Sequence, residues 1–478
     1  MSSITMASMP TRSRSFSFVA LRAVSRASFL LGAVLGIGCA EPRDDPRSGS
    51  AEPSVVGERA AASVDATTRP ARYARQWMTL MFNGIKGDKS PPGVAARSYA
   101  YAAIAMHEAT VHGTPGGHSL GGQLNGLGSL PGPAIGVIYD WETVLAQTMH
   151  RVVNETWVYP LRTFFEYTTT TQASLLALGP QQIGFRRTAG VPEPVIQASL
   201  AFANQLADAL VPWIQADGTP DIRFTGWAPP TGPGKWVPSG FSDTDKIALA
   251  ETPWMRNVRP LVTVDSSECE APPPVPYDTA PSSAFYAQAN AVYQTNLALT
   301  KEQRGIAEYW VDGVGASGTP PGHWIAITTQ FSRSGNLADA IKAYTLVSTA
   351  MFDAAISTWD TKFTHNLLRP ETFIRANIDS SWRTHIPTPQ HPSYTSGHSG
   401  FSTSAAEMLT DLYGSAPWID NTKGRRGFEA RAFPSFLAAA DEAGISRVYG
   451  GIHYAMDNDS GKLIGGCVAQ KIRARILL

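Results

Sequence analysis

Apolar residues recur at intervals of three and four along most of this chain, and they rarely alternate with polar residues as they do in strands. Eight stretches show this helical spacing, at 71–85, 95–113, 139–153, 195–214, 283–298, 300–313, 322–333 and 336–363. Helices with an apolar face bury it against one another in bundles. The pattern therefore predicts an all-α fold of packed helical bundles.

The stretch from 226 to 283 interrupts this pattern. It is crowded with proline and tryptophan, as in "WAPPTGPGKWVPSG" and "APPPVPYDTAPSS". Structureless segments of this length are uncommon inside a compact domain, so this one either separates two helical halves or wraps over their surface. We expect two packed helical bundles, an N-terminal one at 71–225 and a C-terminal one at 284–478.

The first 39 residues are typical of an export signal. Arginines precede the apolar run "ASFLLGAVLGIG", and no acidic residue occurs before Glu41. Leu35 and Cys39 resemble a bacterial lipobox with its leucine one place early, and ordinary signal peptidase cleavage is the alternative. We expect a periplasmic or extracellular protein, lipid-anchored if Cys39 is processed, with a disordered tether at 40–70. No later run is apolar for long enough to span a membrane.

Composition limits the partners and the redox chemistry. Lysine plus arginine and aspartate plus glutamate balance at 39 each, so no net charge attracts nucleic acid or an anionic membrane surface. Cys269 and Cys467 are the two cysteines that remain after cleavage. In an oxidising compartment they either form one disulfide or stay as buried thiols, and their spacing does not suggest zinc. A homo-oligomer is left open.

Three polar clusters follow Trp359. In the first, "WDTKFTHNLLRPETF", Lys362 and Arg369 lie seven residues apart at a helix end, because Pro370 disfavours helix at Arg369. Seven residues is about two helical turns, so we expect both cations on one side. A solvated basic face is the alternative for this cluster alone.

The second cluster, "PTPQHPSYTSGHSGFS", places Ser396, Gly397 and His398 directly before a helical pattern that stops at Gly414. A helix N-terminus offers free N–H groups and a positive dipole end to an oxyanion. The histidine is able to exchange a proton with a bound ligand near neutral pH. A Ser-Gly helix cap with an unrelated histidine is the alternative.

In the third cluster, "ISRVYGGIHYAMDNDSG", Arg447 precedes His453 by six residues and Asp457 follows it by four. On a helix that spacing brings the carboxylate to the imidazole and holds its tautomer. Two glycines predict a bend between Arg447 and His453, and a core His–Asp pair is the alternative. Together the clusters supply three cations, a turn of N–H donors and two histidines, which is a complete site for phosphate or a similar oxyanion.

The three clusters resemble the signature of the vanadium haloperoxidase and type 2 phosphatidic acid phosphatase superfamily. K-x6-RP fits Lys362 to Pro370, and SR-x5-H-x3-D fits Ser446 to Asp457. The middle part, PSxxSGH, departs at Thr395, where the family usually has proline, which leaves the turn less rigid. The stretches "SPPGVAARSYAYAAIAMHEA" and "TPPGHWIAI" are similar to soluble bacterial haloperoxidases rather than integral membrane lipid phosphatases.

The resemblance implies a role for each matched residue. Vanadate oxygens would be held by Lys362, Arg369, Ser396, Gly397 and Arg447. His453, held by Asp457, would bind vanadium through a ring nitrogen, and His398 would be the acid–base group. The protein would supply charge and position, and the bound vanadate would supply the chemistry. Hydrogen peroxide and a halide would be the substrates, with an organic molecule as the acceptor.

Two further positions bear on the choice of halide. His391, five residues before Ser396, stands where the resemblance gives bromoperoxidases a histidine and chloroperoxidases a phenylalanine. Trp359, three residues before Lys362, stands where the family often has tryptophan. The resemblance therefore favours bromide.

The same residues permit a different reaction. In an acid phosphatase the pocket would hold phosphate, His453 would be the nucleophile, His398 would protonate the leaving alcohol, and no cofactor would be needed. The motifs do not separate the two reactions, because phosphate and vanadate have the same shape. A third hypothesis is an exported helical protein that only sequesters oxyanions, and the pair of histidines argues against it.

Overall fold

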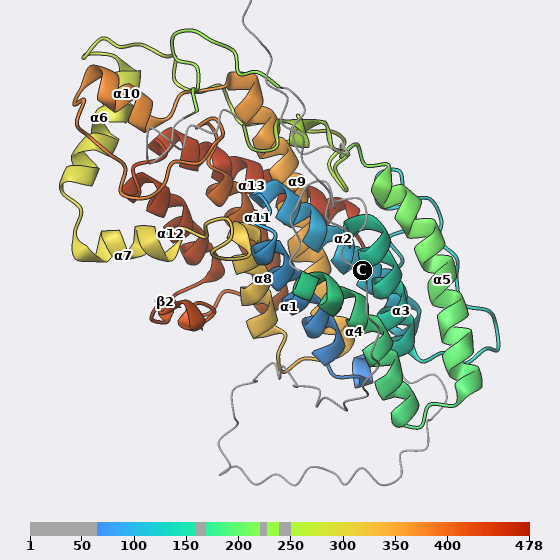
Figure 1. Ribbon diagram of the computed structural model, residues 1–478. Coiled ribbons are helices and arrows are strands. Elements are labelled where there is room, and N and C mark those ends of the chain that lie inside the picture. The colour runs from blue at the N-terminus through green and yellow to red at the C-terminus, as the bar shows by residue number, and fades with distance from the viewer. Residues whose placement is uncertain (1–64, 159–168, 220–226, 239–249) are drawn as a thin grey trace, which may run out of the picture. The chain divides into compact units, whose positions relative to one another are not determined.

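Helices form nearly all the regular structure of the protein in the computed structural model (Figure 1). The structure describes residues 65–158, 169–219, 227–238 and 250–478. The α-helices in these ranges are α1 (Arg72–Gly87), α2 (Pro92–Thr110), α3 (Trp141–Val153), α4 (Thr169–Thr188), α5 (Glu193–Gln215), α6 (Ala284–Leu297), α7 (Lys301–Tyr309), α8 (Thr319–Phe331), α9 (Leu337–His365), α10 (Pro370–Asn377), α11 (Gly397–Tyr413), α12 (Phe436–Tyr449) and α13 (Ala455–Arg475). A short antiparallel hairpin joins β1 (Trp418–Asp420) to β2 (Arg431–Phe433). The predicted all-α class is confirmed.

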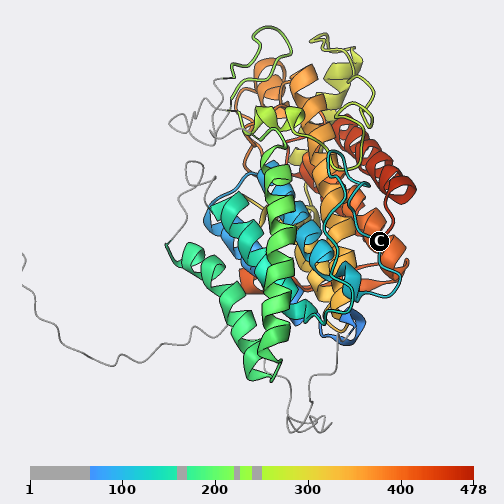
Figure 2. The same ribbon diagram turned by 90° about the vertical axis from the view of Figure 1, so that its right-hand side faces the viewer.

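Helix α9 is the element on which the others are organised. It packs against α2, α8, α11 and α13, and α11 packs in turn against α12 and α13. Helix α3 packs on α2 and carries α4 and α5, so these helices lie on the far side of α2 from α11 (Figures 1 and 2). Because α9 is covered by several helices, most residues along it are buried, including several polar ones.

The eight predicted helices are all present, with ends that differ by a few residues from the sequence pattern. Helices α10 and α12 were not predicted, and neither was α4. It contains Pro180 and Gly179, both of which disfavour a helix interior and disguise the helical pattern. Packing on α3 stabilises α4 despite them.

The predicted export signal and Cys39 lie outside the described residues. The tether was predicted to continue to residue 70, and its last part is a correction, because residues 65–70 belong to the fold. Asp65 caps η1 (Ala66–Thr68), Ala66 is buried, and Pro70 pairs with Asn336. No helix within the described ranges has both the length and the hydropathy needed to cross a membrane.

The proline- and tryptophan-rich segment packs on the C-terminal helices where it is described. Its backbone pairs with the loop that follows α9: Trp236 N donates to Asn366 O at 2.8 Å, and Leu368 N donates to Gly234 O at 3.0 Å. Apart from η5 (Pro253–Asn257), this part of the segment has no helix. The division of the chain into two bundles around this segment stays a prediction.

A buried carboxylate on α9 anchors the same segment. Asp353 accepts hydrogen bonds from the backbone N–H groups of Leu261, Val262 and Thr263 at 2.7 to 2.8 Å. Three such bonds compensate a buried carboxylate for the loss of water. The segment is therefore held along α9, close to the elements that carry the predicted site residues.

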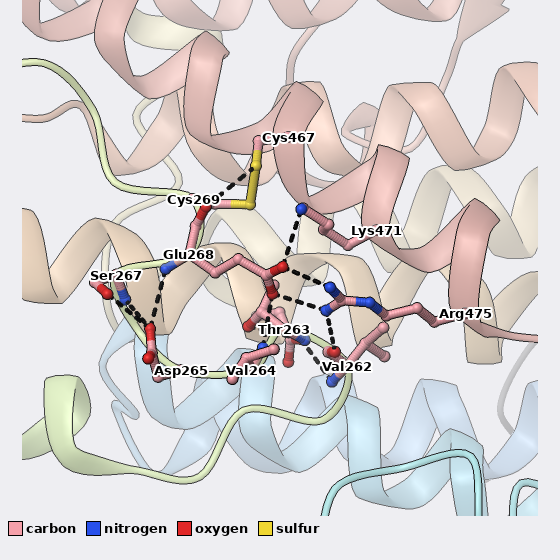
Figure 3. The surroundings of a disulfide bond; sticks show 11 residues. Val262, Thr263, Val264, Asp265, Ser267, Glu268, Cys269, Cys467, Lys471 and Arg475 are labelled. Carbon is pink, nitrogen blue, oxygen red and sulfur yellow. Dashed lines mark hydrogen bonds and ion pairs between the residues drawn. A yellow bond between two sulfur atoms is a disulfide. The ribbon is translucent and has the colours of Figure 1, made fainter.

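A disulfide joins the segment to α13. Cys269 and Cys467 are bonded, with their Cα atoms 5.6 Å apart, which resolves the alternative left open by the sequence. Next to the disulfide, Glu268 accepts from Arg475 at 2.5 and 2.7 Å and pairs with Lys471 at 2.9 Å (Figure 3). The covalent bond and the ion pairs fix the segment to the helix that begins just after His453.

Candidate active site

The predicted site residues come from the ends of five helices, α9 to α13, and the loops between them. Lys362 lies in the last turn of α9, and Arg369 is the N-cap of α10. Asn366, with φ of +52°, ends α9 between them. The expectation that two turns of one helix align these cations is therefore wrong. A left-handed break redirects the chain, and burial rather than helical spacing brings both side chains inward.

Lys362 is buried and binds the loop before α11. Its Nζ atom donates to the carbonyl oxygens of Pro392 and Ser393 at 2.9 and 3.0 Å, and also to that of Thr395. Three acceptors satisfy the three N–H groups of an ammonium. Lys362 thereby holds the residues that lead into Ser396.

Arg369 contacts two of the three predicted histidines, His391 and His453. Its Nε and Nη2 atoms contact the carbonyl oxygen and the Nδ1 atom of His391, each at 2.9 Å. Its Nη1 atom lies 2.9 Å from Ile452 O and 3.0 Å from His453 Nε2. Because a guanidinium can only donate, His453 Nε2 must be the acceptor and carry the free lone pair of the ring.

Asp457 fixes the opposite nitrogen of the same ring. His453 Nδ1 lies 2.8 Å from Asp457 Oδ2, which also accepts from Ser393 Oγ at 2.6 Å. The pairing was expected from four-residue spacing on one helix, but the two residues do not share a helix. His453 precedes α13, and Asp457 in the first turn of α13 reaches back to it. The tautomer with a proton on Nδ1 follows from these contacts.

The start of α11 supplies backbone donors. Ser396 is the N-cap, and Gly397 and His398 are the first two helical residues. The first N–H groups of a helix have no partner within it and carry the positive end of its dipole. Ser396 N donates to Asp457 O at 2.8 Å, which places this helix start beside the residue that holds His453.

His398 and Arg447 form the other side of the cluster. His398 Nε2 lies 2.9 Å from Trp310 O, so this nitrogen carries the proton. Arg447, near the end of α12, donates to Ser446 Oγ and Ala307 O. The predicted bend between Arg447 and His453 is present at Gly450 and Gly451.

Trp359 and His391 line the cluster from the side of α9. Their ring centroids are 5.4 Å apart, and Trp359 Nε1 donates to Glu251 O at 3.2 Å. His391 is buried and receives a hydrogen bond from Arg369. His391 therefore reaches the cluster through Arg369, which agrees with a tuning position rather than a direct ligand.

Burial sets the electrostatics of the cluster. It lowers the pKa of Arg369 to about 10 and that of Arg447 to about 9, and it lowers the pKa of Lys362 further below its usual value. Burial also lowers the pKa of His398 and His453, to which Arg447 and Arg369 respectively add. Both rings are therefore neutral near pH 7. Such a site suits a metal oxyanion. The cations and N–H groups bind its oxygens, and the lone pair of a neutral imidazole binds its central atom.

Burial also raises the pKa of Asp457, and the hydrogen bond from Ser393 opposes that shift. Ser393 was not singled out from the sequence. It lies inside the "PSYTSGH" stretch, so its position was visible there, but nothing in the spacing indicated a contact with a carboxylate 64 residues later.

The part of the chain that carries the site resembles a known protein family. Residues 342–477, which include all ten predicted site residues, match the family of the VCPO second helical-bundle domain. No curated protein matches the chain. Among solved structures, the first bacterial vanadium-dependent iodoperoxidase is 29% identical with a TM-score of 0.75, and the match covers 85% of this chain and 96% of that one.

A bacterial vanadium-dependent chloroperoxidase is more distant in sequence and keeps the fold. Its holo form is 15% identical with a TM-score of 0.58, covering 82% of this chain and 94% of that one. Its apo form is also 15% identical, with a TM-score of 0.59 and coverage of 80% and 93%. These likenesses support the helical architecture and carry no residue roles.

Proposed function

Because the chain belongs to the vanadium haloperoxidase and type 2 phosphatidic acid phosphatase superfamily, we propose that it is a vanadium-dependent haloperoxidase. The observation that carries the proposal is the likeness to an iodoperoxidase over most of both chains, together with the contacts of His453. Hydrogen peroxide and a halide are the proposed substrates, and an organic molecule is the proposed acceptor of the oxidised halogen.

The residues present fit a vanadate ion. Lys362, Arg369 and Arg447 are buried cations. Lys362 binds the residue before Ser396, Arg369 contacts His453, and Arg447 acts electrostatically on His398. The hydroxyl of Thr395 is buried and has no hydrogen-bond partner among the described residues, directly before Ser396. Excess buried positive charge and unused donors of this kind are stabilised by a bound oxyanion. Bound vanadate would activate hydrogen peroxide and supply the oxidising chemistry.

The chain's own residues would bind and orient. Arg369, Ser396, Gly397 and Arg447 would donate to the oxygens of the anion. Lys362 would join them by exchanging one of its three carbonyl contacts for an oxygen of the anion. His453 would hold vanadium through Nε2, because Asp457 keeps the ring proton on Nδ1. His398 would accept or return a proton through Nδ1, since Trp310 O holds its proton on Nε2. The charged and hydrogen-bonding groups would therefore already be in position when the reaction begins.

Bromide is the proposed preferred halide, from the histidine at position 391. Arg369 holds this ring through Nδ1, and the ring also lies against Trp359. Iodide is easier to oxidise than bromide, so an oxidant sufficient for bromide would also oxidise iodide. Oxidation of iodide is therefore proposed beside the preferred oxidation of bromide.

Export is proposed together with this activity. The disulfide between Cys269 and Cys467 supports it, because such bonds persist outside the reducing cytosol. The apolar run before Cys39 supports a signal peptide, with lipid attachment at Cys39 as a further proposal. Mass spectrometry of the mature N-terminus would decide between lipidation and plain cleavage.

The test uses protein stripped of metal and phosphate. Purified enzyme would be assayed for bromination of a phenolic dye with peroxide, before and after addition of vanadate, beside hydrolysis of an aryl phosphate. We expect bromination only with vanadate, and none after His453→Ala. Hydrolysis without vanadate and no bromination with it would instead establish the phosphatase alternative, in which His453 forms a phosphohistidine.

A further inference from the structure

A second buried cluster of charged side chains, centred on His323, lies beside the proposed site and takes no part in holding the anion. His323 on α8 is buried between two carboxylates: Nδ1 lies 2.9 Å from Asp312 Oδ2, and Nε2 lies 2.8 Å from Asp420 Oδ2. An ionised carboxylate only accepts hydrogen bonds. The two contacts therefore exist together only when both ring nitrogens carry a proton and the ring is an imidazolium.

Neighbouring cations keep the two carboxylates ionised. Asp312 Oδ1 pairs with Lys423 at 2.8 Å and with Arg426 at 3.1 Å. Burial would raise the pKa of Asp312 and of Asp420, but Lys423 and His323 outweigh it at Asp312, and His323 outweighs it at Asp420. Both pKa values are thus held well below the usual range. The charges of the cluster are mutually compensated, as a buried cluster requires.

The cluster is attached to His398 through one peptide. The ring of Trp310 lies against His323, with centroids 4.6 Å apart, and Trp310 Nε1 donates to Glu442 at 2.9 Å. Lys423 Nζ donates to the preceding carbonyl, that of Tyr309. The carbonyl of Trp310 itself accepts from His398 Nε2 at 2.9 Å. The side chain and both flanking peptide groups of Trp310 are therefore fixed.

We propose that His323, clamped by Asp312 and Asp420, is a positioning residue that fixes the Trp310 carbonyl and so keeps the proton of His398 on Nε2. The neutral His398 ring then has a single proton-accepting nitrogen, Nδ1. This inference rests on the proposed role of His398 as the acid–base group. His323 touches neither substrate nor anion in this arrangement.

The construction of the cluster supports a positioning role over plain packing. A buried ion pair is often replaceable by apolar side chains at no cost in stability. Here β1 carries Asp420, which contacts His323 on α8. The loop between β1 and β2 carries Lys423 and Arg426, which pair with Asp312 in the loop between α7 and α8. A fixed second partner that sets the tautomer of a functional histidine is a common device around reactive sites.

The test measures the tautomer of His398 directly in the protein without vanadate. Protein with 15N-labelled histidines would be compared as wild type, His323→Gln and Asp420→Asn, with the His398 signals assigned by their loss in His398→Ala. We expect one tautomer, protonated on Nε2, in the wild type and a mixture in both variants. In the vanadate-loaded enzyme, kcat for halide oxidation should fall about tenfold or more. The dissociation constant of vanadate and the KM for peroxide should stay within about twofold.

His107→Gln is the matched control, because His107 is a buried histidine on α2 whose Nε2 lies 2.9 Å from His118 O. It should lower stability and leave the His398 tautomer and kcat unchanged. If His323→Gln does not fold, Asp420→Asn still removes one side of the clamp with nearly the same shape. An unchanged tautomer and kcat in the clamp variants that fold would overturn the inference. A wild type that oxidises no halide would overturn the proposed function, while the tautomer comparison would still decide this one.

Discussion

The Nδ1 atom of His453 lies 2.8 Å from Oδ2 of Asp457, although His453 stands outside the helix that carries the carboxylate. Asp457 reaches back from the first turn of α13 and also accepts from Ser393 Oγ and Tyr454 N. One carboxylate oxygen thereby fixes the ring, the loop before α11 and the helix start together. The lone pair of His453 Nε2 is left on the side of Arg369, where an oxyanion would be held.

Asp457→Asn should weaken vanadate binding. The amide would offer an N–H where the carboxylate accepts, so the ring would lose the constraint that keeps its proton on Nδ1. Replacing such partners of ligating histidines costs about 10- to 100-fold in affinity. Calorimetric titration of vanadate into wild type and variant would measure the change.

Asp459→Asn is the control for that titration. Asp459 lies on the same helix and is exposed, so its replacement should leave vanadate affinity unchanged. Equal affinities of all three proteins would show that Asp457 does not orient His453.

Loss of the disulfide should destabilise the protein. Cys269 and Cys467 are 198 residues apart in sequence, so the bond shortens a long loop in the unfolded chain. Bonds of this kind contribute about 2–5 kcal/mol. Urea unfolding of Cys269→Ser should show a loss in that range, and reductant should destabilise the wild type but leave the variant unchanged. A wild type insensitive to reductant would contradict the prediction.

The ion pairs of Glu268 should give a defined pH dependence. Hydrogen bonds from Arg475 lower the pKa of Glu268 to about 2, below the value of 4.5 expected in the unfolded chain. The folded state therefore binds the proton less readily, and the stabilisation is present above pH 4.5 and is lost as the pH falls toward 2. Thermal midpoints of wild type and Glu268→Gln should differ at pH 7 and converge as the pH is lowered through this window. A constant difference would exclude this carboxylate as the source.

The residue types of the site were visible in the sequence, but several reasons for their placement were not. Lys362 and Arg369 were expected on one helix face, and a left-handed residue at Asn366 separates them instead. Spacing alone predicts a contact only while the backbone conformation stays regular. The choice of residues came from the order of the three motifs, so it did not depend on the helical spacing that proved wrong.

The clamp on His323 shows the opposite situation. Asp312 and Asp420 lie 11 and 97 residues from the histidine they contact, on a loop and a strand. No periodicity links such positions, because the hairpin that brings Asp420 inward is placed by tertiary packing. The proline-rich segment was equally ambiguous, since its pairing with the loop after α9 depends on backbone hydrogen bonds that carry no residue signature.

The crossing of α11 and α13 provides a test of how closely the anion site depends on backbone position. A methyl group added at Gly461 would lie 2.5 Å from Ser396 O and 2.8 Å from Ser399 Cβ. These atoms belong to the helix start that offers N–H donors, so Gly461→Ala must displace it. We expect weaker vanadate binding and lower stability from this single methyl group.

Gly466→Ala is the matched substitution on the same helix, where an added methyl group meets no atom within 4 Å. Alanine favours a helix interior over glycine by about 1 kcal/mol, so this variant should be slightly more stable and bind vanadate normally. Both variants replace glycine by alanine in α13. Melting curves and vanadate titrations would therefore separate the effect of the steric contact at Gly461 from the effect of helix propensity. If Gly461→Ala bound vanadate as tightly as Gly466→Ala, the start of α11 would not be part of the anion site.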